Sequence, residues 1–155
     1  MVEISDFVDA DLDGFTPAMA DLDGVEDWRA MLRGATLFGP AWTGRIDGRI
    51  IGCAGLATLW RGRAQAWCAL DRDVPKRAWV GIHRAVVDRL TRAQADGLRR
   101  IEGETLLGFP PGRRWLEMLG FEEEGLARAY GPRGEDFLRF ARVASHGGGP
   151  HGCVQ

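Results

Sequence analysis

Apolar positions in the first half of the chain change their period several times, and each change predicts an element. Alternating apolar residues in 2–8 predict a first strand. Apolar residues at steps of mostly three in 16–34 predict two short helices, interrupted at Gly24. Three strand-like runs follow, at residues 35–46, 49–60 and 64–70. Asp47-Gly48 favours the positive φ angles of a tight hairpin, so these runs are expected to form an antiparallel meander.

The second half of the pattern predicts a long helix, a strand, a short helix and two closing strands, at residues 75–97, 98–107, 111–119, 121–130 and 136–143. The whole pattern predicts one α/β (α+β) domain over residues 1–143. Its sheet is expected to be mixed and mostly antiparallel, with about six to seven strands and about four flanking helices. Residues 144–155, rich in Gly and His, are expected to form a flexible tail.

Charge and composition narrow the function classes. The 20 Lys and Arg nearly balance 22 Asp and Glu, for a formal net charge of −2. Such a chain has no general attraction for nucleic acid or anionic membranes, so neither is expected as a partner. No apolar run reaches the roughly 20 residues that cross a bilayer, and the start lacks signal-peptide features, so a cytoplasmic protein is expected. The three cysteines form no disulfide framework, and no metal site is expected.

One segment near the end of the chain has a distinctive pattern. Residues 113–121 read Arg-Arg-Trp-Leu-Glu-Met-Leu-Gly-Phe, and Glu124-Gly125 follows. The segment resembles the short-helix signature of the GNAT N-acetyltransferase superfamily, whose element order also matches over essentially the whole folded chain. Its Arg-Trp-Leu-x-x-Leu-Gly-Phe pattern is also similar to an acetyltransferase-like family encoded by short-tailed bacteriophages. Some members of that family are virion-assembly proteins.

The GNAT resemblance implies an acetyl-CoA site whose glycine-rich loop precedes the long helix. Here the loop at 71–81 holds a single glycine, Gly81, and Pro75 removes a backbone donor, so the pyrophosphate nest is degenerate. Asp73 is expected to cap the helix and to occupy the same donors.

Other parts of the cofactor site do not depend on the glycines of that loop. Three cations near the start of the helix are candidate phosphate ligands, with solvated surface residues as the alternative reading: Arg72, Lys76 and Arg77. The resemblance implies that backbone groups of the preceding strand hold the pantetheine and the acetyl oxygen. In this sequence they belong to Trp67, Cys68, Ala69 and Leu70.

The catalytic positions of the family are altered. The resemblance implies an Asn before the short helix and a proton-donating Tyr within it, which fall at Phe109 and Leu116. The only tyrosine, Tyr130, is expected on a late strand in a packed or hydrogen-bonded role.

A general base is easier to supply, and the candidates are Asp71, Glu102 and Glu104. Glu102 and Glu104 share one face of a strand. That face opens either to the cleft or, with Arg100 nearby, to solvent.

Two functions follow from this sequence. The first is an acetyl-CoA-dependent N-acetyltransferase of atypical or weak activity, acting on a small-molecule or protein amine. The second keeps the GNAT fold without the reaction: a phage-related assembly or interaction protein that binds no CoA and meets a protein partner such as a virion component.

Overall fold

Seven strands form one mixed sheet in this computed structural model, which describes residues 1–21 and 27–145. The strand order is β1-β2-β3-β4-β5-β7-β6, and only the β4–β5 pair is parallel. The strands are β1 (Glu3–Asp6), β2 (Ala41–Ile46), β3 (Arg49–Trp60), β4 (Arg63–Leu70), β5 (Arg100–Leu106), β6 (Glu122–Ala127) and β7 (Phe137–Val143). The α-helices are α1 (Trp28–Thr36), α2 (Trp79–Ala95) and α3 (Pro110–Met118), with short 3₁₀ turns at Asp9–Asp13, Ala18–Asp21 and Lys76–Ala78.

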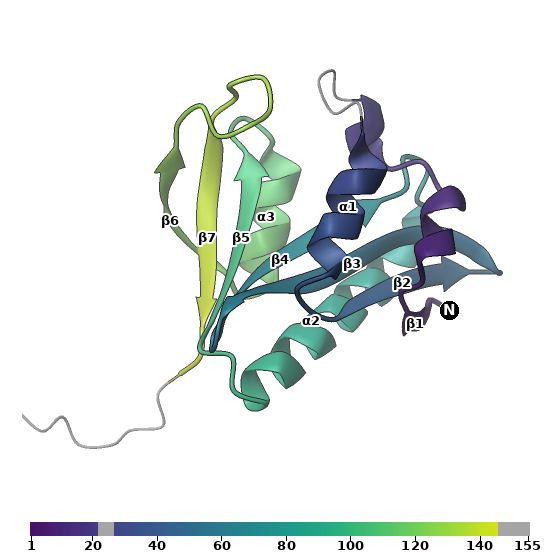
Figure 1. The fold of residues 1–155 in the computed structure, drawn as a ribbon, viewed down its shortest axis with the longest axis horizontal. Coiled ribbons are helices and arrows are strands. Elements are labelled where there is room, and N and C mark those ends of the chain that lie inside the picture. The colour runs from purple at the N-terminus through teal and green to yellow at the C-terminus, as the bar shows by residue number, and fades with distance from the viewer. Residues whose placement is uncertain (22–26, 146–155) are drawn as a thin grey trace, which may run out of the picture.

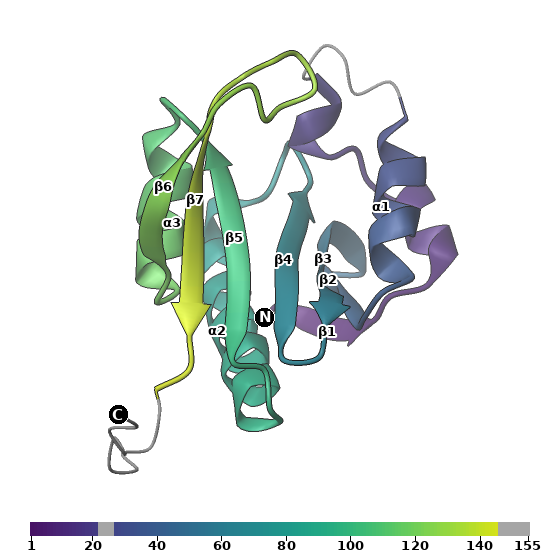
Figure 2. The ribbon, with the colours of Figure 1, turned by 60° about the vertical axis from the view of Figure 1, so that its left-hand side comes forward.

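The helices cover the two faces of the sheet unequally. Helix α1 lies on one face, and α2 and α3 lie on the other (Figures 1 and 2). Under α1 the core joins Trp28 and Leu32 to Cys53 of β3. The opposite core joins Leu90 of α2 to Phe140 of β7. The face of β5, β7 and β6 on the α1 side carries no helix of the described chain (Figure 2).

Turn chemistry and periodicity predicted most elements correctly. Asp47 and Gly48 have φ angles of 50° and 77°, as a tight hairpin requires. Gly120 has φ 89° after α3, and Phe121 donates its N–H to the Leu116 carbonyl at 3.0 Å, which closes the helix as a left-handed cap. None of the helices in the described ranges is long and apolar enough to cross a membrane.

Three boundaries were predicted wrongly. Residue Ala35 belongs to α1 rather than to a strand, because the helix runs on to Thr36 and closes with a 3.2 Å hydrogen bond from the Leu37 N–H to the Gly34 carbonyl. Strand β2 therefore starts at Ala41. Strand β6 ends at Ala127 rather than at 130, because the chain turns there. The predicted interruption at Gly24 and the predicted tail beyond residue 145 lie outside the described residues.

The sheet separates between β4 and β5. These strands pair only from Arg63 to Gln65 on β4 and from Arg100 to Glu102 on β5. Beyond that point β4 continues along β3 and β5 continues along β7. The later backbone groups of β4 on this side therefore have no strand partner, and a cleft opens in the middle of the sheet.

Candidate active site

The cleft between β4 and β5 has a volume of about 670 Å³. Its central walls are Gln65 to Cys68 of β4 and Gly103 to Thr105 of β5. Side chains from α1, α2 and α3 also line it, so the cleft reaches both faces of the sheet. Most of its lining is apolar, as in a site that binds a largely apolar ligand part and orients it with few polar groups.

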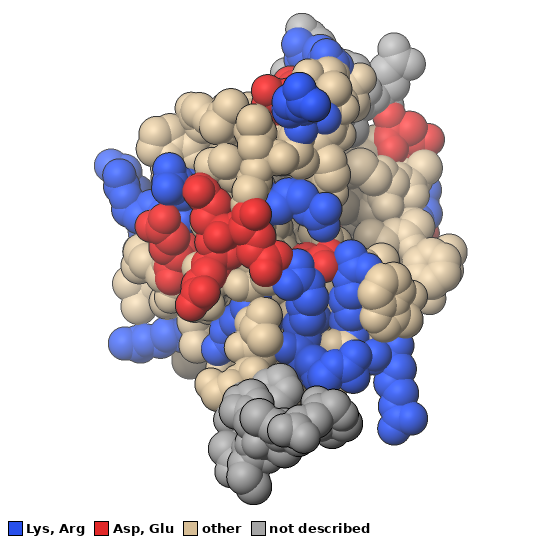
Figure 3. Space-filling view, turned by 90° about the vertical axis from the view of Figure 1, so that its left-hand side faces the viewer, with Lys and Arg blue, Asp and Glu red and all other residues tan. Residues whose placement is uncertain are grey.

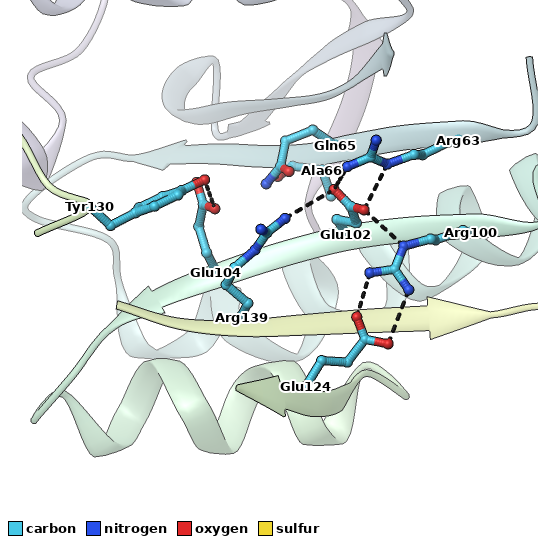
Figure 4. Close-up of polar contacts among 9 residues, drawn as sticks. All are labelled: Arg63, Gln65, Ala66, Arg100, Glu102, Glu104, Glu124, Tyr130 and Arg139. Carbon is cyan, nitrogen blue, oxygen red and sulfur yellow. Dashed lines mark hydrogen bonds and ion pairs between the residues drawn. The ribbon is translucent and has the colours of Figure 1, made fainter. Parts of the chain in front are cut away.

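Glu104 and Tyr130 supply a polar pair at this cleft. The Tyr130 hydroxyl donates a 2.5 Å hydrogen bond to Glu104 Oε2, and both residues line the cleft (Figure 4). Burial, followed by the hydrogen bond to the carboxylate, raises the pKa of Tyr130 to about 12. The phenol therefore stays protonated at neutral pH and is suited to donate a proton.

Tyr130 lies in the loop between β6 and β7 and not on a strand, which corrects the sequence prediction. Two backbone hydrogen bonds hold this loop, from the N–H groups of Tyr130 and Gly131 to the Glu135 carbonyl, both 2.9 Å. The Tyr130 ring packs on Phe137 with 5.4 Å between centroids. The residue as a whole remains 45% exposed, at the rim of the cleft rather than in the core.

Glu102 and Glu104 share one strand face as predicted, but their surroundings differ. Glu102 is 4% exposed and accepts hydrogen bonds from Arg63 Nε (2.7 Å), Arg63 Nη2 (3.0 Å) and Arg100 Nε (2.8 Å). Arg139 Nη2 adds a 3.5 Å contact (Figure 4). The hydrogen bonds from Arg63 outweigh burial and lower the pKa of Glu102. The shared face is thus enclosed by arginines at Glu102 and opens to the cleft at Glu104.

Asp71 follows β4 and is likewise tied to structure. Its carboxylate accepts hydrogen bonds from Arg49 Nη2 (2.6 Å) and from the backbone N–H groups of Asp73 (2.9 Å) and Thr16 (3.2 Å). Burial alone would raise its pKa, but these hydrogen bonds together hold the pKa below its usual value. Asp71 does not line the cleft, so Glu104 is the candidate base that the structure places there.

The predicted pantetheine residues divide between the cleft and the core. Trp67, Cys68 and Leu70 line the cleft, whereas Ala69 is buried in the core under α1. Within the cleft Cys68 is accessible but deeply placed, and burial raises the pKa of its thiol to about 12. The Trp67 Nε1–H is buried and has no hydrogen-bond partner in the described part of the chain.

The loop before α2 differs from its prediction in one respect. Asp73 does not cap a helix, because the chain enters the 3₁₀ turn at Lys76–Ala78 with Pro75 as the cap residue and no side-chain cap. No carboxylate therefore sits on the first helical N–H groups, which remain a favourable place for an anion.

The charged residues of this loop have different surroundings. Arg77 Nη2 pairs with Asp47 at 2.7 Å, and both side chains are exposed. Gly81 packs against Val2, where a Cβ atom would lie 2.7 Å from a Val2 methyl group. Arg72 and Lys76 are exposed at the start of the helix.

The contact between Glu104 and Tyr130 could not be predicted from the sequence pattern. Phe109 and Leu116, at the positions where the resemblance implied an Asn and a proton-donating Tyr, both line the cleft. The available hydroxyl comes instead from Tyr130, 14 residues beyond Leu116 in the numbering. No local pattern connects Tyr130 with Glu104, since their contact depends on how the β6–β7 loop folds back.

Solved structures show the same fold. A putative phosphinothricin N-acetyltransferase aligns over 94% of this chain and all of its own, with 18% identity and a TM-score of 0.75. An acetyltransferase of Bacillus subtilis, solved in complex with CoA, aligns over 94% of this chain and all of its own, with 13% identity and a TM-score of 0.73. The ribosomal-protein-S18-alanine N-acetyltransferase of Escherichia coli covers 99% of this chain with all of its own length, at 18% identity and a TM-score of 0.71. No protein-family model and no curated protein matches the sequence.

Proposed function

We propose that this protein binds acetyl-CoA in the β4–β5 cleft and transfers the acetyl group to an amine. The observation that carries the proposal is the pair of Glu104 and Tyr130 at a cleft lined by β4 backbone without a strand partner. The same fold occurs in a Bacillus subtilis acetyltransferase solved with CoA, which supports this choice of ligand. Bound acetyl-CoA would supply an activated thioester carbonyl.

The chain offers groups that fit such a ligand. Backbone N–H and C=O groups of residues 67–70 on the β5 side are available to hydrogen-bond an amide-containing arm. The uncapped start of the 3₁₀ turn and α2 suits the pyrophosphate, with Arg72 and Lys76 as charged side chains beside it. Arg77 contributes less, since it already pairs with Asp47.

Glu104 and Tyr130 account for the two proton transfers. Glu104 takes the proton of the attacking amine as the C–N bond forms. Tyr130 gives its proton to the sulfur as the C–S bond breaks, which fills the role that Leu116 cannot perform. The proton on Glu104 then returns to the Tyr130 phenolate through their hydrogen bond, so the pair is restored for the next turnover.

The decisive experiment combines binding and turnover. Acetyl-CoA at a hundred times its dissociation constant is expected to stabilise the fold by about 2.7 kcal/mol. That stabilisation corresponds to a rise of about 6–10 °C in the melting temperature. Incubation with amines should release free CoA thiol and give products 42 Da heavier by mass spectrometry, the mass of an acetyl group replacing hydrogen.

Variants of the polar pair assign the roles. Glu104→Gln and Tyr130→Phe are each expected to lower kcat by about 10²–10⁴-fold while acetyl-CoA still stabilises the fold. Glu122→Gln is the matched control, because this exposed residue of β6 lies outside the cleft lining and should keep wild-type kcat. Unchanged kcat in both Glu104→Gln and Tyr130→Phe would overturn the assignment of these roles.

A non-catalytic role is the alternative function. It describes a GNAT-fold assembly or interaction protein, related to those of bacteriophages, whose cleft binds no CoA. Absence of any thermal shift at millimolar acetyl-CoA would overturn the enzyme proposal and favour this alternative. Co-purification with virion components would then be the measurement to make.

A further inference from the structure

Arg139 lies beside the proposed base and has spare hydrogen-bonding capacity. It is the cross-strand partner of Glu104 in the β5–β7 pair, so the two side chains stand next to each other on one face of the sheet. Its side chain is 42% exposed and contacts Glu102 at 3.5 Å. Arg139 is not itself one of the cleft-lining residues, but it stands at the edge of the cleft beside Glu104, which lines it. A guanidinium carries five N–H donors, and this long contact engages little of that capacity.

The cluster around Glu102 does not need Arg139 for charge balance. Arg63 and Arg100 already place three hydrogen bonds of 2.7–3.0 Å on the Glu102 carboxylate. Arg100 also forms a pair of hydrogen bonds with Glu124. Arg63 and Arg100 therefore balance Glu102 and Glu124, 2 − 2 = 0, and the charge of Arg139 is left to face Glu104, its cross-strand neighbour. Of the three arginines, Arg139 makes the longest contact with these carboxylates.

The surface around this cluster has mixed charge. The view from the β6–β7 side shows a patch of acidic side chains bordered by Lys and Arg side chains (Figure 3). A mixed surface of this kind gives no broad attraction for a polyanion or a polycation. The charge of Arg139 therefore acts locally, on a group that comes within a few ångströms of it.

Gln65 faces the same region from the other side of the cleft. Its side chain comes from β4 and lies across from Arg139 (Figure 4). The Gln65 amide makes a long hydrogen bond of 3.4 Å to the Ala66 carbonyl and lines the cleft. An incoming oxygen atom could thus meet a guanidinium and a carboxamide close to Glu104.

The adjoining wall of the cleft is apolar. Residues from the 3₁₀ turn at Ala18–Asp21, α1, β4, the β6–β7 loop and β7 contribute to it: Met19, Met31, Leu32, Trp67, Pro132 and Phe137. A wall of this kind stabilises an apolar body by about 25 cal/mol for each Å² of surface that it removes from water. Among the described residues, these six side chains carry no charge that would pair with a second ammonium group.

We infer that the amine acceptor is an apolar amino acid, in which the amino group and a carboxylate share one carbon. This inference rests on the proposed acetyltransferase function. Glu104 receives the amino group, Arg139 and Gln65 receive the carboxylate, and the apolar wall receives the side chain. The adjacent opposite charges of Glu104 and Arg139 match the adjacent charges of such a zwitterion, whereas a polyamine would meet the guanidinium unfavourably.

Matched acceptor pairs test the inference. Leucine is compared with 3-methylbutylamine, and phenylalanine with phenethylamine, by CoA release at saturating acetyl-CoA and with rates corrected for the fraction of free amine. The wild-type kcat/KM should be at least about tenfold higher for each amino acid, because one good charge-assisted contact is worth that factor or more. Arg139→Ala should raise KM for the amino acids about 10–100-fold and leave both simple amines unchanged. Arg139→Lys should restore part of the loss.

Arg114→Ala is the matched control, because this exposed arginine carries the same charge but lies on α3, apart from the β5–β7 pair that places Arg139 beside Glu104. Equal kcat/KM for the members of each pair would overturn the inference and leave the acetyltransferase proposal standing. Acetyl-CoA binding without acetylation of any apolar amino acid would also overturn it. An equal loss for both acceptors in Arg139→Ala would show that Arg139 positions Glu104 instead. Failure to bind acetyl-CoA is the separate result that overturns the proposed function.

Discussion

At the scale of single residues, the contact between Tyr130 and Glu104 sets the protonation of the phenol. The phenol is partly buried and donates to a carboxylate, and both effects disfavour the phenolate. The raised pKa keeps the Tyr130 phenol protonated at neutral pH, so in the proposed reaction its proton is in place when the C–S bond breaks. A tyrosine in water would lose this proton about two pH units earlier.

This pKa can be measured directly, because Tyr130 is the only tyrosine. Alkaline titration followed by phenolate absorbance should give a midpoint near 12 in the folded protein and near 10 in denaturant. Since the folded pKa lies above the unfolded one, the stability linked to this group is fully present below pH 10. It is lost as the pH rises from 10 to 12.

The Glu104→Gln variant separates the two causes of the shift. Replacing the carboxylate by an amide should lower the midpoint, while burial of the ring remains. Glu122→Gln serves as the control and should leave the midpoint where it is in the wild type. A folded midpoint of 10 in the wild type would contradict the hydrogen bond between Tyr130 and Glu104.

At the scale of elements, the parting of β4 from β5 creates the cleft. Strand β5 pairs with β7 along all seven of its residues, from Arg100 to Leu106, but with β4 along only three. The two halves of the sheet are therefore each continuous, and the gap between them costs few strand hydrogen bonds. Glu102 lies at the last paired position and Glu104 lies two residues into the gap, so the enclosed carboxylate and the proposed base are separated by where the pairing stops.

Filling the cleft should abolish ligand binding without unfolding the sheet. Cys68→Phe adds bulk at an accessible position on β4, inside the cleft rather than in the close-packed core. We expect it to melt within a few degrees of the wild type and to lose the stabilisation by acetyl-CoA. Cys68→Ser removes the thiol without adding bulk, so it should keep that stabilisation. Retained stabilisation in Cys68→Phe, measured by thermal melting, would place the ligand elsewhere.

At the scale of the whole molecule, three buried carboxylates each bind an arginine: Asp11 with Arg45, Asp71 with Arg49 and Glu102 with Arg63. Each links segments far apart in the chain, and the pKa of each carboxylate is lowered. For Asp11, burial opposes the shift, but hydrogen bonds from Thr43 (2.6 Å) and Val8 N–H (3.0 Å) and the charge of Arg45 outweigh it.

These pairs predict sensitivity to acid. Because the folded pKa values lie below the unfolded ones, their stabilisation is present above about pH 4–5 and is lost as the pH falls further. Glu102→Gln should lower the free energy of unfolding at pH 7 by about 2 kcal/mol, less than in a fully buried pair because its arginines keep contact with water. In urea titrations, the free energy of unfolding of this variant should fall less between pH 5 and pH 2 than that of the wild type. Glu117→Gln, which changes an exposed ion pair on α3, is the control and should match the wild type. If Glu102→Gln and the wild type lost stability equally between pH 5 and 2, this role of Glu102 would be contradicted.

The sequence alone predicted the order of elements, the Asp47-Gly48 hairpin and the α3 helix with its Gly120 cap. These features depend on local periodicity and on the φ angles that single residues favour, which a linear pattern contains. It failed at the ends of α1 and β6 and at Asp73, where the boundary depends on which residue actually caps the helix or where the chain turns.

Of the candidate site, the sequence selected the stretch of β5 that reaches the cleft but did not separate Glu102 from Glu104, and it placed Tyr130 on a strand instead of in the β6–β7 loop. Those differences come from contacts across strands and loops. Arg63 and Arg100 enclose Glu102, Arg49 holds Asp71, and the β6–β7 loop brings Tyr130 onto Glu104. The protonation of a side chain depends on what surrounds it in space, and the tertiary structure alone decides those surroundings.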